Sequence, residues 1–181
     1  FDPDLYNNLG ISLNALGAFT LASTIFKMVI YLDVMHEDAY YNLGVALGNI
    51  DQKENSIGYY KRSILLRPFK VEALFNLGNK MRPQGGHMNA ISLYRRATAI
   101  KPNWTDVWYN LATCLNEVAQ YYRAIECFDE VLKYDPNNKE AIDNKGRSLL
   151  ALGETGEGLK LRQQAYGLLN FDLRKGINIR K

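Results

Sequence analysis

An asparagine recurs every 34 residues along this 181-residue chain, and its neighbours recur with it. All five asparagines precede Leu-Gly, Leu-Ala or Lys-Gly, and four of them follow an aromatic or acidic residue. The full set is Asn8, Asn42, Asn76, Asn110 and Asn144. A fixed period of this length indicates stacked copies of one supersecondary unit, each contacting only its neighbours. The chain is therefore expected to lack a central core and to present an extended, modular surface.

Two apolar patterns inside each 34-residue unit predict two helices. Positions within each unit are numbered 1 to 34. Position 1 of the five successive units is Pro3, Glu37, Val71, Thr105 and Lys139. Positions 4, 7 and 11 are apolar or aromatic in the first four units, which places them on one face of a helix. In four of the five units a glycine or aspartate at position 15 then breaks the chain. In the second helix position 20 is small and position 24 is aromatic, and proline at position 32 ends this helix in three units.

The small residues at positions 8 and 20 predict a close approach of the two helices, with the aromatic at 24 filling the space beyond. The second unit shows the complete pattern with Tyr40, Leu43-Gly44, Tyr60 and Pro68. The pattern resembles the tetratricopeptide repeat (TPR) family over residues 3 to about 170. The resemblance implies an all-α fold, an α-α superhelix (TPR solenoid) of about five helix-turn-helix repeats, with the first helix of each pair lining a concave groove.

The repeat frame predicts the organisation of the whole chain. Repeats 1 to 4 are expected at residues 3–36, 37–70, 71–104 and 105–138, a degenerate fifth repeat or pair of capping helices at 139–170, and a basic C-terminal tail at 171–181. In the fifth unit Lys145 replaces the leucine at position 7 and Arg162 replaces the aromatic at position 24. A terminal repeat exposes a face that internal repeats bury, so polar substitution is expected of a cap.

Pro83 lies inside the last turn of the first helix of the third unit. Proline disfavours helical geometry in the residue before it, here Arg82. We favour an early end of this helix, with a local bend or hinge as the alternative.

The stripe at positions 2, 6, 9 and 13, with 5 and 12 beside it, is expected to face the groove, as in TPR arrays. An asparagine amide offers both a donor and an acceptor, so a row of amides can pair with an extended peptide backbone. A comparable asparagine ladder grips peptides in the TPR substrate-recruiting domain of the O-GlcNAc transferase family. The candidate peptide-binding residues are Asn8, Asn42, Asn76, Asn110, Asn144, Tyr41, Phe75, Tyr109, Asn79 and Arg82. The alternative is that asparagine at position 6 simply follows the TPR consensus.

Position 2 is acidic in every unit, as Asp4, Asp38, Glu72, Asp106 and Glu140. Negative charge in the first turn of a helix is stabilised by the helix dipole, which is the structural explanation. Together these acids would also favour ligands that carry Lys or Arg. A C-terminal carboxylate clamp is not expected, because Phe75, Glu140 and Asn144 occupy its three basic positions.

Composition and residue types exclude several other functions. The net charge of +3 resides in the C-terminal tail, so the neutral repeats predict no nucleic-acid binding. No apolar run predicts an integral membrane segment. His36 and His87 lack a Cys or carboxylate partner at metal-ligand spacing, so both are expected to be exposed, and no metal site is predicted. No catalytic constellation and no cofactor are expected.

The function predicted from the sequence is a protein–protein interaction module, an adaptor or scaffold that binds an extended peptide segment in its concave groove. One alternative is the substrate-recruiting TPR domain of a larger enzyme such as an O-GlcNAc-type glycosyltransferase. Another is a self-assembling structural scaffold. Cys114 and Cys127 fall on small apolar faces and are expected to be buried thiols, which favours a reducing compartment and a cytoplasmic location.

Overall fold

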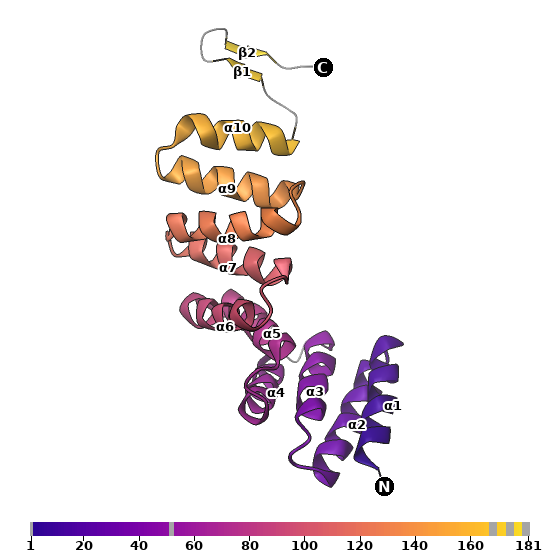
Figure 1. Cartoon of the computed structure of the whole chain (residues 1–181). Coiled ribbons are helices and arrows are strands. Elements are labelled where there is room, and N and C mark those ends of the chain that lie inside the picture. The colour runs from indigo at the N-terminus through magenta and orange to yellow at the C-terminus, as the bar shows by residue number, and fades with distance from the viewer. Residues whose placement is uncertain (1, 51–52, 167–169, 173–175, 179–181) are drawn as a thin grey trace. The chain divides into compact units, whose positions relative to one another are not determined.

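The computed structural model describes residues 2–50, 53–166, 170–172 and 176–178, with side chains described up to 50 and over 55–166 (Figure 1). Within these residues ten α-helices, one 3-10 helix (η1) and two short strands form. Their bounds are α1 Pro3–Ala15, α2 Phe19–Leu32, α3 Glu37–Asn49, α4 Lys53–Leu66, α5 Val71–Met81, η1 Arg82–Gln84, α6 His87–Ile100, α7 Thr105–Glu117, α8 Tyr121–Tyr134, α9 Lys139–Ala151, α10 Thr155–Tyr166, β1 Asn170–Asp172 and β2 Gly176–Asn178. The helices confirm the all-α class and the helix-turn-helix pattern.

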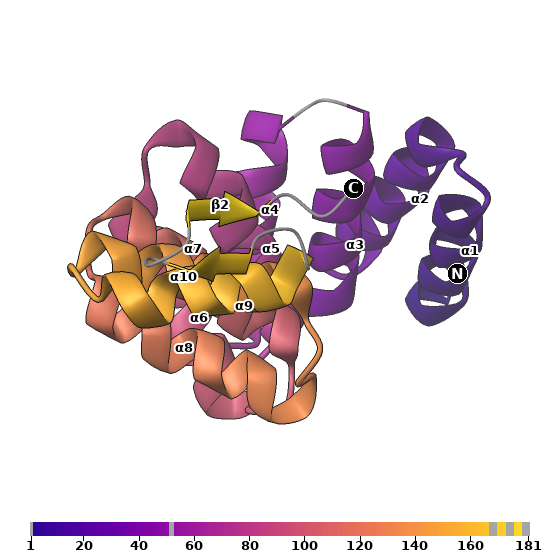
Figure 2. The same ribbon diagram turned by 90° about the horizontal axis from the view of Figure 1, so that it is seen from above.

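The chain divides into two compact units, Phe1–Gly86 and His87–Lys181. In the first unit each of α1 to α4 packs against the next helix in the chain, and in the second unit each of α6 to α9 does the same. The pairing of α9 with α10 can be followed in Figures 1 and 2. The strands β1 and β2 pair antiparallel, starting at the last residue before the expected C-terminal tail, and the sequence pattern does not predict this pair.

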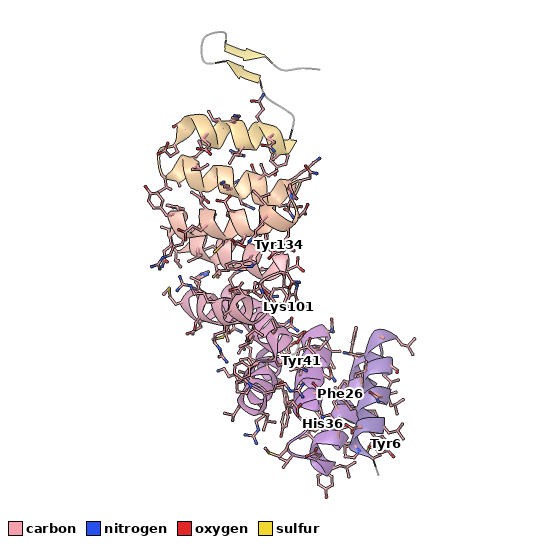
Figure 3. The ribbon with its side chains drawn as sticks, viewed as in Figure 1. Tyr6, Phe26, His36, Tyr41, Lys101 and Tyr134 are labelled. Carbon is pink, nitrogen blue, oxygen red and sulfur yellow. The ribbon has the colours of Figure 1, made fainter. Side chains whose placement is uncertain are left out.

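Close contact between position 8 of the first helix and position 24 of the second holds the helix pairs of the first two repeats together. A Cβ placed on Gly10 would lie 2.5 Å from the ring of Phe26, and one on Gly44 would lie 2.8 Å from the ring of Tyr60. Both rings are buried, with 0% and 2% exposed, and Phe26 can be located in Figure 3. Any side chain larger than hydrogen at Gly10 or Gly44 would therefore displace a packed ring.

The aromatic at position 24 also contacts the aromatic at position 5 of the same repeat. The ring centroids of Tyr41 and Tyr60 are 6.0 Å apart, and those of Tyr109 and Phe128 are 5.9 Å apart in an edge-to-face arrangement. Such aromatic pairs add roughly 0.5–1.5 kcal/mol to the stabilisation from burial alone. This contact connects the core of a repeat to the surface that position 5 faces.

The fifth repeat replaces this aromatic pair by an ion pair at the same two positions. Arg162 Nε donates to Asp143 Oδ1 at 2.7 Å, and Arg147 Nε lies 2.9 Å from Asp143 Oδ2. The carboxylate is buried, and two arginines compensate for its desolvation. At position 7 Lys145 pairs with Asp129 of α8 at 2.6 Å. The polar residues of this repeat therefore make specific contacts within the helical fold.

The first helix of the third repeat ends early. Here α5 ends at Met81, and η1 continues from Arg82 to Gln84 around Pro83. Proline is accommodated because η1 places it in its first turn. This agrees with the early helix end favoured from the sequence.

Position 15, which follows the first helix, adopts the left-handed conformation wherever the structure describes it. The φ angles are 77° at Gly17, 76° at Gly85, 57° at Ala119 and 87° at Gly153. Glycine adopts this conformation without steric cost, whereas an L-residue with a Cβ is strained by about 1–2 kcal/mol. Ala119 is therefore the strained member of the series.

We expect Ala119→Gly to raise the free energy of unfolding by about 0.5–1 kcal/mol, because relief of strain exceeds the entropy cost of a glycine in the unfolded chain. The reverse change at the equivalent turn of the next repeat, Gly153→Ala, should lower it by about 1 kcal/mol. Urea unfolding followed by circular dichroism measures both. A less stable Ala119→Gly variant would show that the turn does not strain Ala119.

Candidate peptide-binding surface

The first helices of the repeats carry nearly all of the candidate peptide-binding residues. In the first unit they are Asn8 on α1, Tyr41 and Asn42 on α3, and Phe75, Asn76 and Asn79 on α5, followed by Arg82 in η1. In the second unit they are Tyr109 and Asn110 on α7 and Asn144 on α9. Asn8 is exposed and the others are half-buried. We refer to these faces of α1, α3 and α5, and of α7 and α9, as the first-helix surface of each unit.

The position-6 asparagines are hydrogen-bonded between repeats. In three cases the Nδ2 group donates to the position-5 side chain of the preceding repeat. The pairs are Asn42 to Asn7 Oδ1 at 3.1 Å, Asn76 to Tyr41 Oη at 3.3 Å and Asn144 to Tyr109 Oη at 3.0 Å. Asn110 Nδ2 donates instead to the Asp106 carbonyl of its own helix at 2.8 Å. The recurring amide therefore has a structural role, linking neighbouring first helices.

These bonds occupy only part of each amide group, which has two N–H donors and one carbonyl acceptor. They also fix the orientation of the amide and of the tyrosine beside it. Burial and the charge of Glu72 raise the pKa of the Tyr41 hydroxyl above its usual value, and the hydrogen bond from Asn76 opposes this shift. Tyr41 therefore stays protonated at neutral pH, so its oxygen accepts from Asn76 while its proton can be donated.

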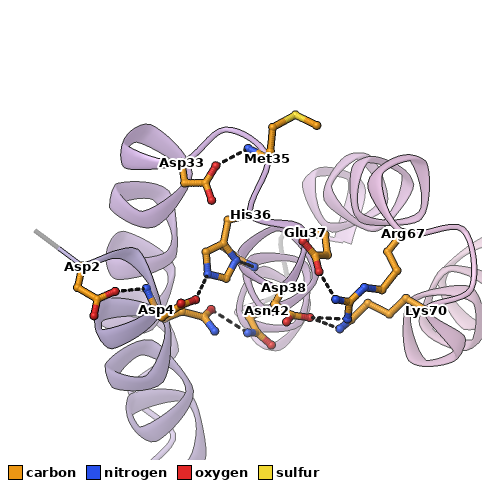
Figure 4. Close-up of polar contacts among 12 residues, drawn as sticks. Asp2, Asp4, Asp33, Met35, His36, Glu37, Asp38, Asn42, Arg67 and Lys70 are labelled. Carbon is orange, nitrogen blue, oxygen red and sulfur yellow. Dashed lines mark hydrogen bonds and ion pairs between the residues drawn. The ribbon is translucent and has the colours of Figure 1, made fainter.

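Asp4 and Asp38, the acids at position 2 of the first two repeats, are paired with residues at the end of their own repeat (Figure 4). His36 Nε2 lies 3.2 Å from Asp4 Oδ1, while His36 Nδ1 accepts from the Ala39 N–H and caps α3. Lys70 and Arg67 both pair with Asp38. The expectation of an exposed His36 is wrong, because capping and the contact with Asp4 hold the imidazole at 9% exposure. The negative charge expected along this edge is thus partly neutralised.

Lys70 connects this acidic edge with the aromatic at position 5. Its Nζ lies 4.8 Å from the centroid of the Tyr41 ring, over its face, while it also pairs with Asp38. Partial burial acts to raise the pKa of Asp38, but the hydrogen bond and charge of Lys70 and the charge of Arg67 outweigh it, so the pKa lies below its usual value. The resulting stabilisation is present above the unfolded-state pKa and is lost as the pH falls through the lowered value.

Two cavities open on the surface of the second unit near the contact between α7 and α9. The first, of about 320 Å³, is lined by Thr105, Asp106, Tyr109, Val131, Asn138 and Glu140. The second, of about 290 Å³, is lined by Thr113, Asn116, Glu117, Tyr121, Asn144, Arg147 and Ser148. The bond from Asn144 to Tyr109 joins one lining residue of each cavity. The first cavity combines two carboxylates with an aromatic, and the second is amide-rich and carries charges of both signs.

Several polar residues of this surface are absent from the sequence-based candidates. Asn7 is buried and accepts from Asn42, and Ser148 Oγ donates to Asn116 Oδ1 at 2.8 Å across α7 and α9. The usable sequence signal is the period itself, because Asn116 and Ser148 lie 32 residues apart, as do His36 and Asp4. Contacts at 32 and 35 residues join equivalent turns of successive first helices.

Comparison with known proteins supports the family resemblance found in the sequence. The tetratricopeptide-repeat family models match residues 37–70 and 105–138, each over one repeat. The chain is a tetratricopeptide-repeat protein. No curated protein matches its sequence.

Solved TPR structures share the fold of this TPR protein. A crystal structure of MamA superposes with a TM-score of 0.84 at 22% identity, covering 91% of this chain and 90% of that one. YrrB, described as a TPR protein with an unusual peptide-binding site, gives a TM-score of 0.85 at 18% identity, covering 92% and 86%. These similarities establish the TPR solenoid fold.

TPR proteins are generally non-catalytic interaction modules that bind proteins or peptides, and the fold is consistent with a protein-interaction scaffold. Within the part of the chain that the structure describes, no helix is both long and apolar enough to traverse a bilayer.

We expect Tyr109→Phe to lower the free energy of unfolding by about 0.5–1.5 kcal/mol, because it removes the acceptor for Asn144 and keeps the ring against Phe128. Tyr122→Phe on α8 is the matched control, since its side chain is 73% exposed and its stability should not change. Chemical unfolding compares the two variants. Equal stabilities would mean that the inter-repeat bond contributes nothing to folding.

Proposed function

We propose that this TPR protein binds an extended segment of a partner protein on the first-helix surface. The observation that carries the proposal is the oriented row of position-6 amides, which in the second unit joins two polar cavities at Asn144 and Tyr109. Hydrogen bonds between repeats already hold three of these amides in place, so little side-chain entropy is lost when a ligand binds.

An extended peptide presents N–H and C=O groups along its backbone, and amides satisfy both kinds of group. Asn42 and Asn76 in the first unit, and Asn110 and Asn144 in the second, supply such contacts in this proposal. Tyr41, Phe75 and Tyr109 supply apolar contacts for peptide side chains, while Asn79 and Arg82 contribute at the end of α5. The description of YrrB as a peptide-binding TPR protein supports this use of the fold.

The second unit favours a peptide with a basic side chain. Asp106 and Glu140 line the same cavity, beside the Tyr109 ring. A Lys or Arg side chain there would meet two carboxylates and could pack its methylene groups on the aromatic. We propose a cytoplasmic setting, because both cysteines are buried thiols, as expected in a reducing compartment.

The test is selection of peptides from a random displayed library on the immobilised full chain, followed by fluorescence anisotropy with the selected peptides. We expect Asn110→Ala to weaken binding by about fivefold to tenfold, because one amide contact contributes roughly 1 kcal/mol. Glu140→Gln should weaken peptides with Lys or Arg more than peptides without them. Tyr122→Ala on the exposed face of α8 is the control that should leave affinity unchanged.

Two results would contradict this function. One is a library selection that yields no peptide. The other is equal affinity of wild type, Asn110→Ala and an Asn42, Asn76 and Asn110 triple alanine variant whose circular dichroism shows intact helices. A ladder used only for stability would weaken folding in the triple variant without changing peptide affinity.

A second candidate function, self-association, is favoured by the apolar face of α1. Leu5 and Leu9 are 66% and 46% exposed, whereas Ala39 and Leu43 at the same repeat positions on α3 are fully buried. Leu43 packs in a core cluster with Phe26 of the preceding repeat. On this alternative α1 contacts a second copy of the chain.

For self-association we expect a molar mass that rises with protein concentration in light scattering, and a lower mass for Leu9→Glu at equal concentration. Burying a charge in the contact would destabilise it. Leu65→Glu on α4, where the leucine is 68% exposed, should behave as wild type. A monomer at all concentrations would exclude this alternative.

A further inference from the structure

Three residues with metal-binding side chains meet between α6 and α7 in the second unit. His87 is the first residue of α6, and Cys114 and Glu117 lie one turn apart near the end of α7. One ligand atom from each of the three residues can be chosen so that all lie within 4.8 Å of one another. The sequence shows no Cys or carboxylate at metal-ligand spacing from His87, but helix packing brings Cys114 and Glu117 close to it.

The geometry of this cluster follows from the helices that carry it. Cys114 and Glu117 are three residues apart, so they face the same side of α7. The Cys114 thiol is fully buried and donates to the His87 carbonyl at 3.9 Å. Glu117 Oε2 lies 3.0 Å from His87 Nδ1. The two elements therefore bring one sulfur, one nitrogen and one oxygen ligand to a common point.

The His87 ring nitrogen has an unusual environment. Nδ1 is buried and close to Glu117, yet it makes no aligned hydrogen bond with any residue that the structure describes. A neutral imidazole has a lone pair on one ring nitrogen, which is the electron pair that a metal ion accepts. The side chains of His87 and Glu117 retain access to solvent, since 33% and 37% of them are exposed. An ion can thus reach the cluster.

We propose that His87, Cys114 and Glu117 bind one divalent transition-metal ion of the zinc class. Metal–ligand bonds of about 2.0–2.3 Å place tetrahedral ligands about 3.3–3.6 Å apart, so rotamer adjustments of about 1 Å close the cluster around the ion. The Cys114 thiol releases its proton to solvent as the sulfur–metal bond forms. The fourth position remains open, as at sites with three protein ligands.

The ligand set favours zinc over the common hard cations. Thiolate and imidazole prefer zinc and similar ions, whereas calcium and magnesium require mainly oxygen ligands. Glu117 also lines the cavity of about 290 Å³ that contains Asn144 and Arg147. The site therefore lies beside the first-helix surface, although it does not depend on the proposed peptide binding.

The test uses the reduced full chain with Co²⁺ as a spectroscopic probe and Zn²⁺ as a competitor. We expect one Co²⁺ per chain, with a thiolate-to-cobalt charge-transfer band that Zn²⁺ removes and Mg²⁺ does not. Cys114→Ser should abolish the band, and His87→Gln and Glu117→Gln should weaken binding by about tenfold or more. Zn²⁺ should raise the Tm of the wild type, because it binds only the folded chain.

Cys127→Ser is the matched control. Cys127 is a buried thiol of the same unit, and burial together with the charge of Glu126 raises its pKa to about 12, so it stays protonated. The band should persist in this variant. A band that is absent from wild type, or that depends on Cys127 rather than Cys114, would overturn the proposal. His87→Gln, on a partly exposed residue, keeps the test valid if Cys114→Ser does not fold.

Discussion

The close contact between position 8 and the aromatic at position 24 is the constraint on which the repeat structure depends. With hydrogen at position 8, the ring of Phe26 or Tyr60 packs directly against the first helix. This short separation brings position 5 within reach of the same ring, as in the pair of Tyr41 and Tyr60. Core packing therefore determines which side chains stand on the first-helix surface and how firmly they are held.

The sequence predicted the helices well because their signal is periodic and local. Apolar spacing, the breaks at position 15 and the prolines at position 32 act within one repeat, so a single chain suffices to detect them. The pair of Asp143 and Arg162 was harder to predict. Each residue alone suggests a degenerate cap, and only the structure shows that the two substitutions compensate for each other at the positions of an aromatic pair.

The sequence placed the candidate residues on the first helices but did not reveal their contacts. Periodicity put Asn42, Asn76 and Asn144 on the correct helices, and their partners lie one repeat earlier. Helical spacing within a repeat cannot reveal such contacts, because they depend on how successive repeats stack. For the same reason, helical spacing did not predict the contact of His36 with Asp4 or that of His87 with Glu117.

The structural and binding roles of the asparagine ladder are compatible in physical terms. Loose amides on a surface would have to lose rotamer freedom to grip a peptide, at a cost of about 0.5–1.5 kcal/mol for each immobilised side chain. Hydrogen bonds to Tyr41 and Tyr109 already restrict the rotamers of Asn76 and Asn144 in the folded protein, so less rotamer freedom is lost on binding. Recurrence of asparagine at position 6 is explained by stacking, so the support for a ligand comes from the orientation of the amides beside the cavities. The cavities of the second unit add to this support, because stacking does not require Asp106 and Glu140 to share one.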